Sequence, residues 1–194
     1  MNRQQVPTPP AKERSSGAYL TPNLPSYEKL GLTLDSYTHI QPGGRQVALE
    51  LLRSFLHRRG ENYTAEMSSP VTALSSCSRL STHLAFGTLS VREVYQAAQQ
   101  RYDEIRMSQS AASWQWSRAL RSFLSRLRWH CHFIQKLEDE PAIEFRNMHA
   151  AYDNLRDSCK GNDLFDRWKK GETGYPMVDA CMRCLIKTGY MNFR

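Results

Sequence analysis

The sequence contains no apolar run of the roughly 18 residues that a membrane-spanning helix needs, so no such helix is expected. Residues 1–16 have no apolar stretch, which argues against a secretory signal peptide. The sequence lacks the alternation of apolar and polar residues that indicates a half-buried strand, and no internal repeat is evident. What remains is a chain of 194 residues, long enough for one domain with a tail.

Cysteine and histidine are few and are not spaced for a metal. Five cysteines are scattered along the chain, an odd number that argues against a disulfide framework and predicts a reducing, cytoplasmic location. Cys181 and Cys184 form a C-x-x-C with no second pair for zinc, and we interpret them as small half-buried residues one helical turn apart. The six histidines show no metal-binding spacing, so no metal is predicted.

Neither a G-x-G-x-x-G nor a Walker loop occurs, which excludes the two commonest nucleotide-binding loops. The charge is mildly basic, with 26 Lys and Arg against 19 Asp and Glu and a net charge of +7. Such a balance suits a polyanionic partner such as nucleic acid, although by itself it is weak support.

The chain divides at residue 44 by composition. Residues 1–44 contain six prolines and four glycines with little periodicity, and we interpret them as a tail that resembles an interdomain linker. Residues 45–194 have helical periodicity throughout. We therefore expect an all-α helical bundle over residues 45–194.

Four features predict individual helices. Val47, Leu51 and Phe55 recur at helical spacing, and Gly60 suits the position just after the helix end. Ser90 and Glu93 have the spacing of a capping box. A long helix is expected over residues 111–137, where the apolar stripe comprises Trp116, Leu120, Phe123, Leu127, Cys131 and Ile134. A last helix is expected to start at Pro176 and to end at Gly189.

Residues 168–191 read W-K-K-G-E-T-G-Y-P-M-V-D-A-C-M-R-C-L-I-K-T-G-Y-M. Each has an ordinary role: Gly171 and Gly174 allow a tight turn, Pro176 starts a helix, and Asp179 and Arg183 are spaced as an i, i+4 pair. Such roles explain a helix–turn–helix corner but not the whole string. The run resembles the flavin-domain signature of the DNA photolyase and cryptochrome family, W-x-x-G-x-T-G-Y-P-x-V-D-A-x-M-R-x-L-x-x-T-G-[WY]-M, at every fixed position.

A second segment, residues 76–90, clusters hydroxyl groups where a helix is expected to start, which suits a phosphate. Ordinary helix capping by Ser78 is the alternative. The segment resembles the family's T-S-x-L-S, which implies that it wraps the diphosphate of FAD; Cys77 replaces the Thr. The resemblance also implies that Tyr63, upstream, reaches the phosphates. The implied FAD-binding residues are Tyr63, Cys77, Ser78, Arg79, Leu80 and Ser81.

A third segment, residues 123–133, resembles the family's W-x-x-E-L-x-W-R-x-F, in which a Trp and a charged residue line the substrate cavity. Trp129 matches, whereas Arg126 stands where repair enzymes often have a Glu, and His130 replaces an Arg. The resemblance implies catalytic roles for Arg126 and Trp129. It implies that DNA is contacted by Arg126, Trp129, His130, Phe133, Phe193 and Arg194.

Four basic side chains, Arg118, Arg121, Arg128 and His132, share one face of the same expected helix. For a lone helix, a solvated charged face is the favoured interpretation. Trp129 and Phe133 lie on a neighbouring stripe, and aromatic residues interleaved with arginines favour binding to nucleic acid.

Together, the resemblance implies a partial FAD-binding domain over residues 45–194 that acts in light-driven repair of pyrimidine dimers. The expected partner is damaged DNA, and the folded chain is expected to be monomeric. A cryptochrome-like blue-light photoreceptor without repair is the first alternative. It is favoured by Arg126, by Met67, which stands where photolyases often have a DNA-contacting Arg, and by Phe193, which stands where the family often has a polar Asn. The second is an inactive truncated fragment, because neither the family's antenna domain nor the helices that follow the signature are present in the sequence.

Overall fold

The computed structural model describes residues 25–32, 40–108, 113–155, 157 and 161–191. Residues Met1–Thr38 and His39–Arg194 form two separate units. The described part of the first unit holds one 3₁₀ turn, Glu28–Leu30. Most of the residues interpreted as a linker, and the implied DNA contacts Phe193 and Arg194, lie outside the described residues.

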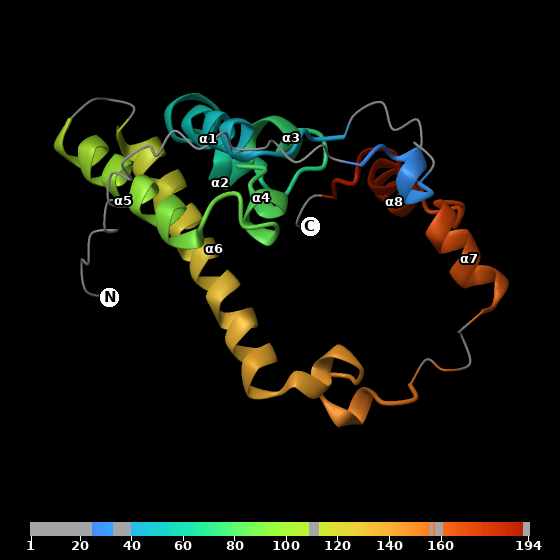
Figure 1. Ribbon diagram of the computed structural model, residues 1–194. Helices are drawn as coiled ribbons and strands as arrows, with labels where there is room; N and C mark the ends of the chain where they lie inside the picture. Colours follow the sequence, from blue (N-terminus) through green and yellow to red (C-terminus); the bar gives the residue numbers. More distant parts are fainter. Residues whose placement is uncertain (1–24, 33–39, 109–112, 156, 158–160, 192–194) are drawn as a thin grey trace, which may run out of the picture. The chain divides into compact units, whose positions relative to one another are not determined.

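The second unit is helical, and its described residues contain no strand, which confirms the all-α prediction (Figure 1). In chain order the helices are α1 (Arg45–Ser54), α2 (Tyr63–Glu66), α3 (Ala73–Ser76), α4 (Ser81–Ala85), α5 (Val91–Met107), α6 (Ser113–Asp139), α7 (Asp163–Lys170) and α8 (Pro176–Thr188). Short turns of helix at Phe55–Arg59, Pro141–Glu144 and Ala150–Tyr152 complete the set.

The end of α1 differs from the sequence expectation. The helix widens into a π-helical turn over Phe55–Arg59, and Gly60 has φ −81° instead of the left-handed conformation typical of a residue after a helix. Glycine is needed there for close approach, since a Cβ would lie 2.5 Å from the carbonyl oxygen of Phe55. The buried face of the element is Ala48, Leu52, Phe55 and Leu56.

Helices α5 and α6 pack side by side and carry most of the core (Figure 1). The capping box is confirmed: Ser90 Oγ accepts from the backbone N–H of Glu93 at 3.1 Å, and the Glu93 carboxylate accepts from the Ser90 backbone. The buried stripe of α6 consists of Trp116, Ala119, Leu120, Phe123, Leu124 and Leu127. Burial of this stripe is the main hydrophobic contribution to the unit.

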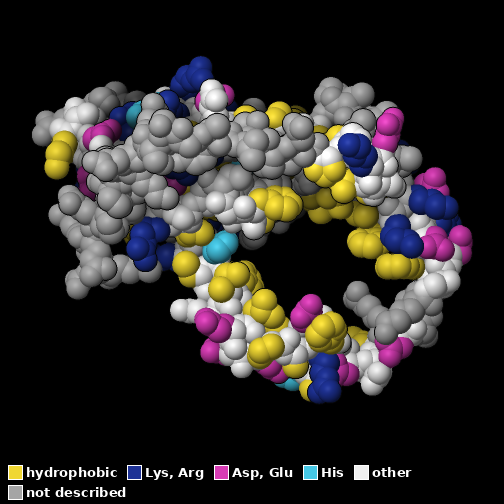
Figure 2. Space-filling view, viewed as in Figure 1, with side chains coloured by type: hydrophobic (Ala, Val, Ile, Leu, Met, Phe, Trp, Pro, Cys, Tyr) yellow, Lys and Arg dark blue, Asp and Glu magenta, His cyan; other side chains and the backbone are white. Residues whose placement is uncertain are grey.

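The second half of α6 is different. Past Leu127 the stripe continues with Cys131, which is half-buried, and Ile134, which is 53% exposed, and the aromatic residues beside it, Trp129 and Phe133, are exposed to the same extent. Figure 2 shows hydrophobic side chains gathered over this part of the helix and the segment that follows it. The predicted stripe is thus correct in its spacing, but only its first half is buried.

Helices α7 and α8 pack against each other through a tight corner. Pro176 starts α8 and Gly189, at φ +67°, ends it, as the sequence predicts. Gly171 ends α7 at φ +70°, and a Cβ there would lie 2.9 Å from both the Asp179 carbonyl oxygen and Arg183 Cγ. The first glycine of the signature is therefore needed for both its conformation and the close approach of α8.

Candidate functional site

Tyr63 lies in an aromatic cluster that joins three helical elements. Its ring makes edge contacts with Phe55, at 5.5 Å between centroids, and with Phe123, at 6.0 Å. Phe55 and Phe123 are themselves 4.6 Å apart, and all three rings are buried. Burial raises the pKa of the Tyr63 hydroxyl to about 12, so this group stays neutral at physiological pH.

The serine segment, residues 77–81, is held by Arg59 from the π-helical turn. The Arg59 guanidinium donates to the carbonyl oxygens of Cys77 at 2.6 Å and Ser78 at 3.3 Å. It also donates to the Leu51 carbonyl oxygen at 3.2 Å, which connects the segment to α1. Burial, followed by the nearby charge of Arg79, lowers the Arg59 pKa. The side chain remains a cation, since arginine is not deprotonated in proteins.

Arg79 has a left-handed backbone, with φ +59°, which is uncommon for a residue other than glycine. The Gln41 side chain binds it twice, donating to the Arg79 carbonyl oxygen at 2.9 Å and accepting from Arg79 Nε at 3.1 Å. The Arg79 guanidinium also lies 4.8 Å from the centre of the Tyr190 ring. A residue before α1, the serine segment and the residue after α8 therefore meet at Arg79.

The local electrostatics are positive. Burial raises the pKa of both the Cys77 thiol and the Tyr190 hydroxyl, which hydrogen bond to each other, so both are neutral. Arg126 acts on Tyr63 electrostatically and lowers its pKa against the effect of burial. The charges close to the serine segment are those of Arg59 and Arg79, and such a site favours an anionic ligand.

Ser78 does not cap a helix, contrary to the alternative considered from the sequence. Helix α4 starts at Ser81, and its cap residue, Leu80, makes no side-chain cap bond. Leu80 is instead a core residue, 1% exposed. Within the described part of the chain, the hydroxyls of Ser78 and Ser81 have no hydrogen-bond partner and can bind a ligand. These hydroxyls and the Arg79 guanidinium are donors that suit a diphosphate, whereas Arg59, whose five N–H groups all donate within the chain, contributes only its charge.

The implied DNA contacts lie farther along α6. Arg126 is half-buried and close to Tyr63, whereas Trp129 is exposed one helical turn later. Trp129 and Phe133 form an exposed aromatic pair with ring centroids 6.1 Å apart, and His130 beside them is exposed. The structure therefore brings Tyr63, the serine segment and Arg126 together, and it places the other α6 residues next to one another on the exposed half of the helix.

The signature residues build the α7–α8 corner. Asp179, 7% exposed, accepts hydrogen bonds from the Thr173 backbone N–H at 2.8 Å, the Thr173 hydroxyl at 2.6 Å and the Gly174 N–H at 3.0 Å. These bonds, the Thr173 hydroxyl first, lower the Asp179 pKa, and Arg183 contributes least. The i, i+4 pairing with Arg183 expected from the sequence is thus only a weak electrostatic interaction.

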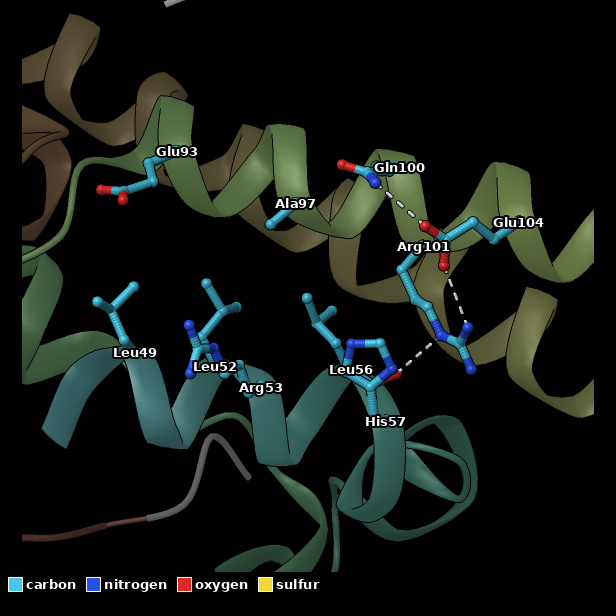
Figure 3. A pocket seen from close by; sticks show the side chains of 10 residues that line it. All are labelled: Leu49, Leu52, Arg53, Leu56, His57, Glu93, Ala97, Gln100, Arg101 and Glu104. Carbon is cyan, nitrogen blue, oxygen red and sulfur yellow. Dashed lines mark hydrogen bonds and ion pairs between the residues drawn. The ribbon is translucent and has the colours of Figure 1, made fainter. Parts of the chain in front are cut away.

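A groove between α1 and α5 lies apart from these residues (Figure 3). Its volume is about 240 Å³, which is below the usual range for small-molecule sites. It is lined by Leu49, Leu52, Arg53, Leu56, His57, Glu93, Ala97, Gln100, Arg101 and Glu104. No residue implied by the family resemblance lines it.

The described residues contain neither a cluster of metal ligands nor a membrane-spanning helix. No group of three His, Cys, Asp or Glu side chains there could hold a metal ion. Among the same residues, no helix has the length and hydropathy needed to cross a bilayer.

Two residues that organise the serine segment could not be identified from the sequence. Gln41 and Arg59 are 38 and 18 positions away from Arg79 and Cys77, their partners. Neither Gln41 nor Arg59 belongs to a local sequence motif that would indicate its role. The cluster of basic residues at 57–59 was the one available signal for Arg59, and it does not indicate a partner.

Comparison with known proteins identifies the family of the chain. Residues 123–194 match the sequence model of a family described as the FAD binding domain of DNA photolyase. The deoxyribodipyrimidine photo-lyase of Halobacterium salinarum is 33% identical over 175 residues, which cover 90% of this chain and 34% of that protein. The photo-lyase of Synechococcus sp. is 31% identical over 180 residues, with the same coverage of each chain.

A cryptochrome DASH from Natronomonas pharaonis is 30% identical over 200 residues, covering 98% of this chain and 38% of that protein. The chain thus spans about a third of the length of these relatives. FAD is the cofactor of the matched domain, and the donors around the serine segment fit its diphosphate. With the all-α fold, these matches show that the chain carries part of an FAD-binding domain of the photolyase and cryptochrome family.

Proposed function

We propose that the serine segment binds the diphosphate of FAD, and that the bound flavin serves light-driven repair of pyrimidine dimers in DNA. The observation that carries the proposal is the pair of unpartnered hydroxyls, Ser78 and Ser81, beside the guanidinium groups of Arg59 and Arg79. Hydroxyl donors next to fixed cations stabilise a polyphosphate through charge-assisted hydrogen bonds. FAD supplies the electron-transfer chemistry, and the residues of the chain position it.

In this proposal each residue has a defined part. Ser78 and Ser81 donate to phosphate oxygens, while Arg59 keeps the segment in shape through the Cys77 and Ser78 carbonyls. Leu80 anchors the segment in the core. Arg79 contributes its charge, and Cys77, a neutral thiol, adds a weak donor in place of a hydroxyl.

We assign the binding of the damaged pyrimidines to the exposed half of α6. Trp129 and Phe133 offer stacking surfaces to bases that have been flipped out of the duplex. Arg126 and His130 supply hydrogen-bond donors to base carbonyls or phosphate. Phe193 and Arg194 remain part of the proposal by resemblance alone.

Flavin binding is tested by titrating the chain with FAD and following flavin fluorescence and absorbance. The double variant S78A/S81A removes two hydrogen bonds to a charged group, each worth about 1.5–3 kcal/mol, so the Kd for FAD should rise at least tenfold. The matched control is Ser125→Ala, an exposed serine of α6, which should leave the Kd unchanged. Equal Kd values for the wild type and S78A/S81A would refute this use of the segment.

Repair is tested separately, with a thymine-dimer oligonucleotide under blue light and in the dark. Light-dependent restoration of the thymines is the expected result. Retention of FAD without restoration would instead support a flavin photoreceptor that does not repair DNA. One observation favours this second candidate: a cation, Arg126, acts electrostatically on Tyr63 and stands about one helical turn before the exposed Trp129, where the resemblance places a carboxylate in repair enzymes.

A further inference from the structure

Helices α5 and α6 share a row of tyrosine and arginine side chains that the flavin site does not use. Arg121 donates to the Tyr102 hydroxyl at 2.9 Å, and Arg128 donates to the Tyr95 hydroxyl at 3.4 Å. The guanidinium groups of Arg106 and Arg121 each lie 5.9 Å from the centre of the Tyr102 ring. We call these five residues the tyrosine–arginine row.

The row has a regular spacing along both helices. Tyr95 and Tyr102 are seven residues apart on α5, as are Arg121 and Arg128 on α6. Seven residues are nearly two helical turns, or about 10.5 Å, so each helix repeats the same face. Because α5 and α6 pack against each other, the two Tyr–Arg pairs are held on a rigid support.

No carboxylate in the described part of the chain forms an ion pair with the row. Among the described residues, the ion pairs join Arg45 to Glu93, Arg101 to Glu104 and Lys169 to Asp166, and none involves Arg106, Arg121 or Arg128. The acidic side chains of α5 are engaged elsewhere. Figure 3 shows Glu104 accepting from Gln100 and paired with Arg101. Asp103 accepts from Gln99 at 3.1 Å.

This arrangement leaves positive charge that is both positioned and available. All three arginines of the row are exposed. The bond to a tyrosine hydroxyl uses one of the five N–H donors of a guanidinium and leaves the others for a ligand. Arg106 and Arg121 place two like charges near one ring, so an anion bound close to that ring would be attracted to both.

We propose that the tyrosine–arginine row binds the phosphate backbone of undamaged double-stranded nucleic acid. Fixed cations repeated along a rigid face suit a polymer with regularly spaced phosphates, and the net charge of +7 draws such a polymer to the chain. The row goes beyond the proposed lesion site, since Arg121 and Arg128 are on a different face of α6 from Arg126. Binding at the row requires neither flavin nor light.

The test measures the Kd for an undamaged, fluorescently labelled duplex of about 20 base pairs, in the dark, between about 50 and 200 mM salt. Each phosphate contact contributes about 0.9 to the slope of log K against log[salt]. The double variant R121Q/R128Q should therefore lower the magnitude of that slope by about 1.8. The charge-matched control K170Q/K187Q, which alters exposed lysines of α7 and α8, should lower it by much less.

Two more variants separate charge from folding and from positioning. R121K/R128K keeps the charge and should restore most of the slope even if the glutamine variant is less stable. Y95F/Y102F keeps every cation but removes the hydroxyl acceptors, so it should raise the Kd and leave the slope close to that of the wild type. Equal slopes for R121Q/R128Q and K170Q/K187Q would overturn the proposal.

Polyglutamate of equal charge is the competitor that tests the kind of polymer. We expect it to displace the duplex poorly, because carboxylates on a flexible chain do not keep a fixed spacing. Displacement as efficient as that by unlabelled duplex would show that the row accepts any polyanion, and would contradict the assignment to nucleic acid. Loss of FAD binding in S78A/S81A would not alter any of these results, so the two proposals fail independently.

Discussion

The α5–α6 core and the α7–α8 corner are held by different forces. In the core, large apolar side chains such as Leu120 and Phe123 are almost fully buried. In the corner, α7 has no buried residue and α8 has two, Asp179 and Met182. The corner depends instead on the buried carboxylate of Asp179 and on Gly171, which lets α8 approach the end of α7. A family signature can therefore describe a backbone geometry as much as a ligand site.

The largest expected effect comes from the same truncation made in each region. Leu120→Ala removes a side chain that is 0% exposed and should cost about 2–5 kcal/mol of unfolding free energy. Leu185→Ala, at a position that is 37% exposed on α8, should cost less than half as much. Urea denaturation followed by circular dichroism measures both. Equal costs would mean that the corner is packed as tightly as the core.

A smaller effect is expected from two glycines of the corner that share a left-handed backbone. Gly171→Ala meets both an unfavourable φ of +70° and two contacts at 2.9 Å, so it should cost about 2–4 kcal/mol. Gly189→Ala has φ +67° but open space around the new methyl group, so only the conformational cost of about 1–2 kcal/mol applies. Thermal melts of the two variants provide the measurement, and a larger loss for Gly189→Ala would exclude the close-approach explanation.

The smallest effect is a pH dependence confined to the corner. Hydrogen bonds from Thr173 and Gly174 hold the pKa of Asp179 below its ordinary value of about 3.9. A depressed folded-state pKa contributes stability that is complete above the unfolded value and is lost as the pH falls through the folded value. The protection factors of the Thr173 and Gly174 amides, which compare their exchange with that of unprotected amides at the same pH, should therefore fall below about pH 4, before the core opens. In Asp179→Asn these protection factors should already be lower at neutral pH and should show no further fall over that acidic range.

Features that depend on near neighbours in the chain could be predicted from the sequence. The capping box of Ser90 and Glu93, the start of α8 at Pro176 and its end at Gly189 all appear as expected. Each involves residues within a turn or two of one another, so periodicity and capping rules suffice. The spacing of the α6 stripe is predicted for the same reason.

Features that depend on distant partners could not be predicted. The same stripe in α6 is buried at Leu120 and exposed at Ile134, because burial depends on what packs against each half. Ser78 has the composition of a helix cap, but the helix begins three residues later. Gln41 and Arg59 act through bonds to positions 79 and 77, and no local pattern reports such bonds.

The bonds made by Arg59 also determine how the serine segment can move. One planar guanidinium joins the carbonyl oxygens of Leu51 and Cys77, which are 26 positions apart in the chain, through two different nitrogens, Nη2 and Nη1. A lysine has three donors on a single nitrogen and cannot reach both sites at once. Arg59→Lys would therefore preserve the local charge but release the segment from α1, so that FAD would meet a fluctuating loop and bind more slowly. In the proposed binding mode, the association rate of FAD, and not only its affinity, would thus depend on a side chain that never needs to touch the cofactor.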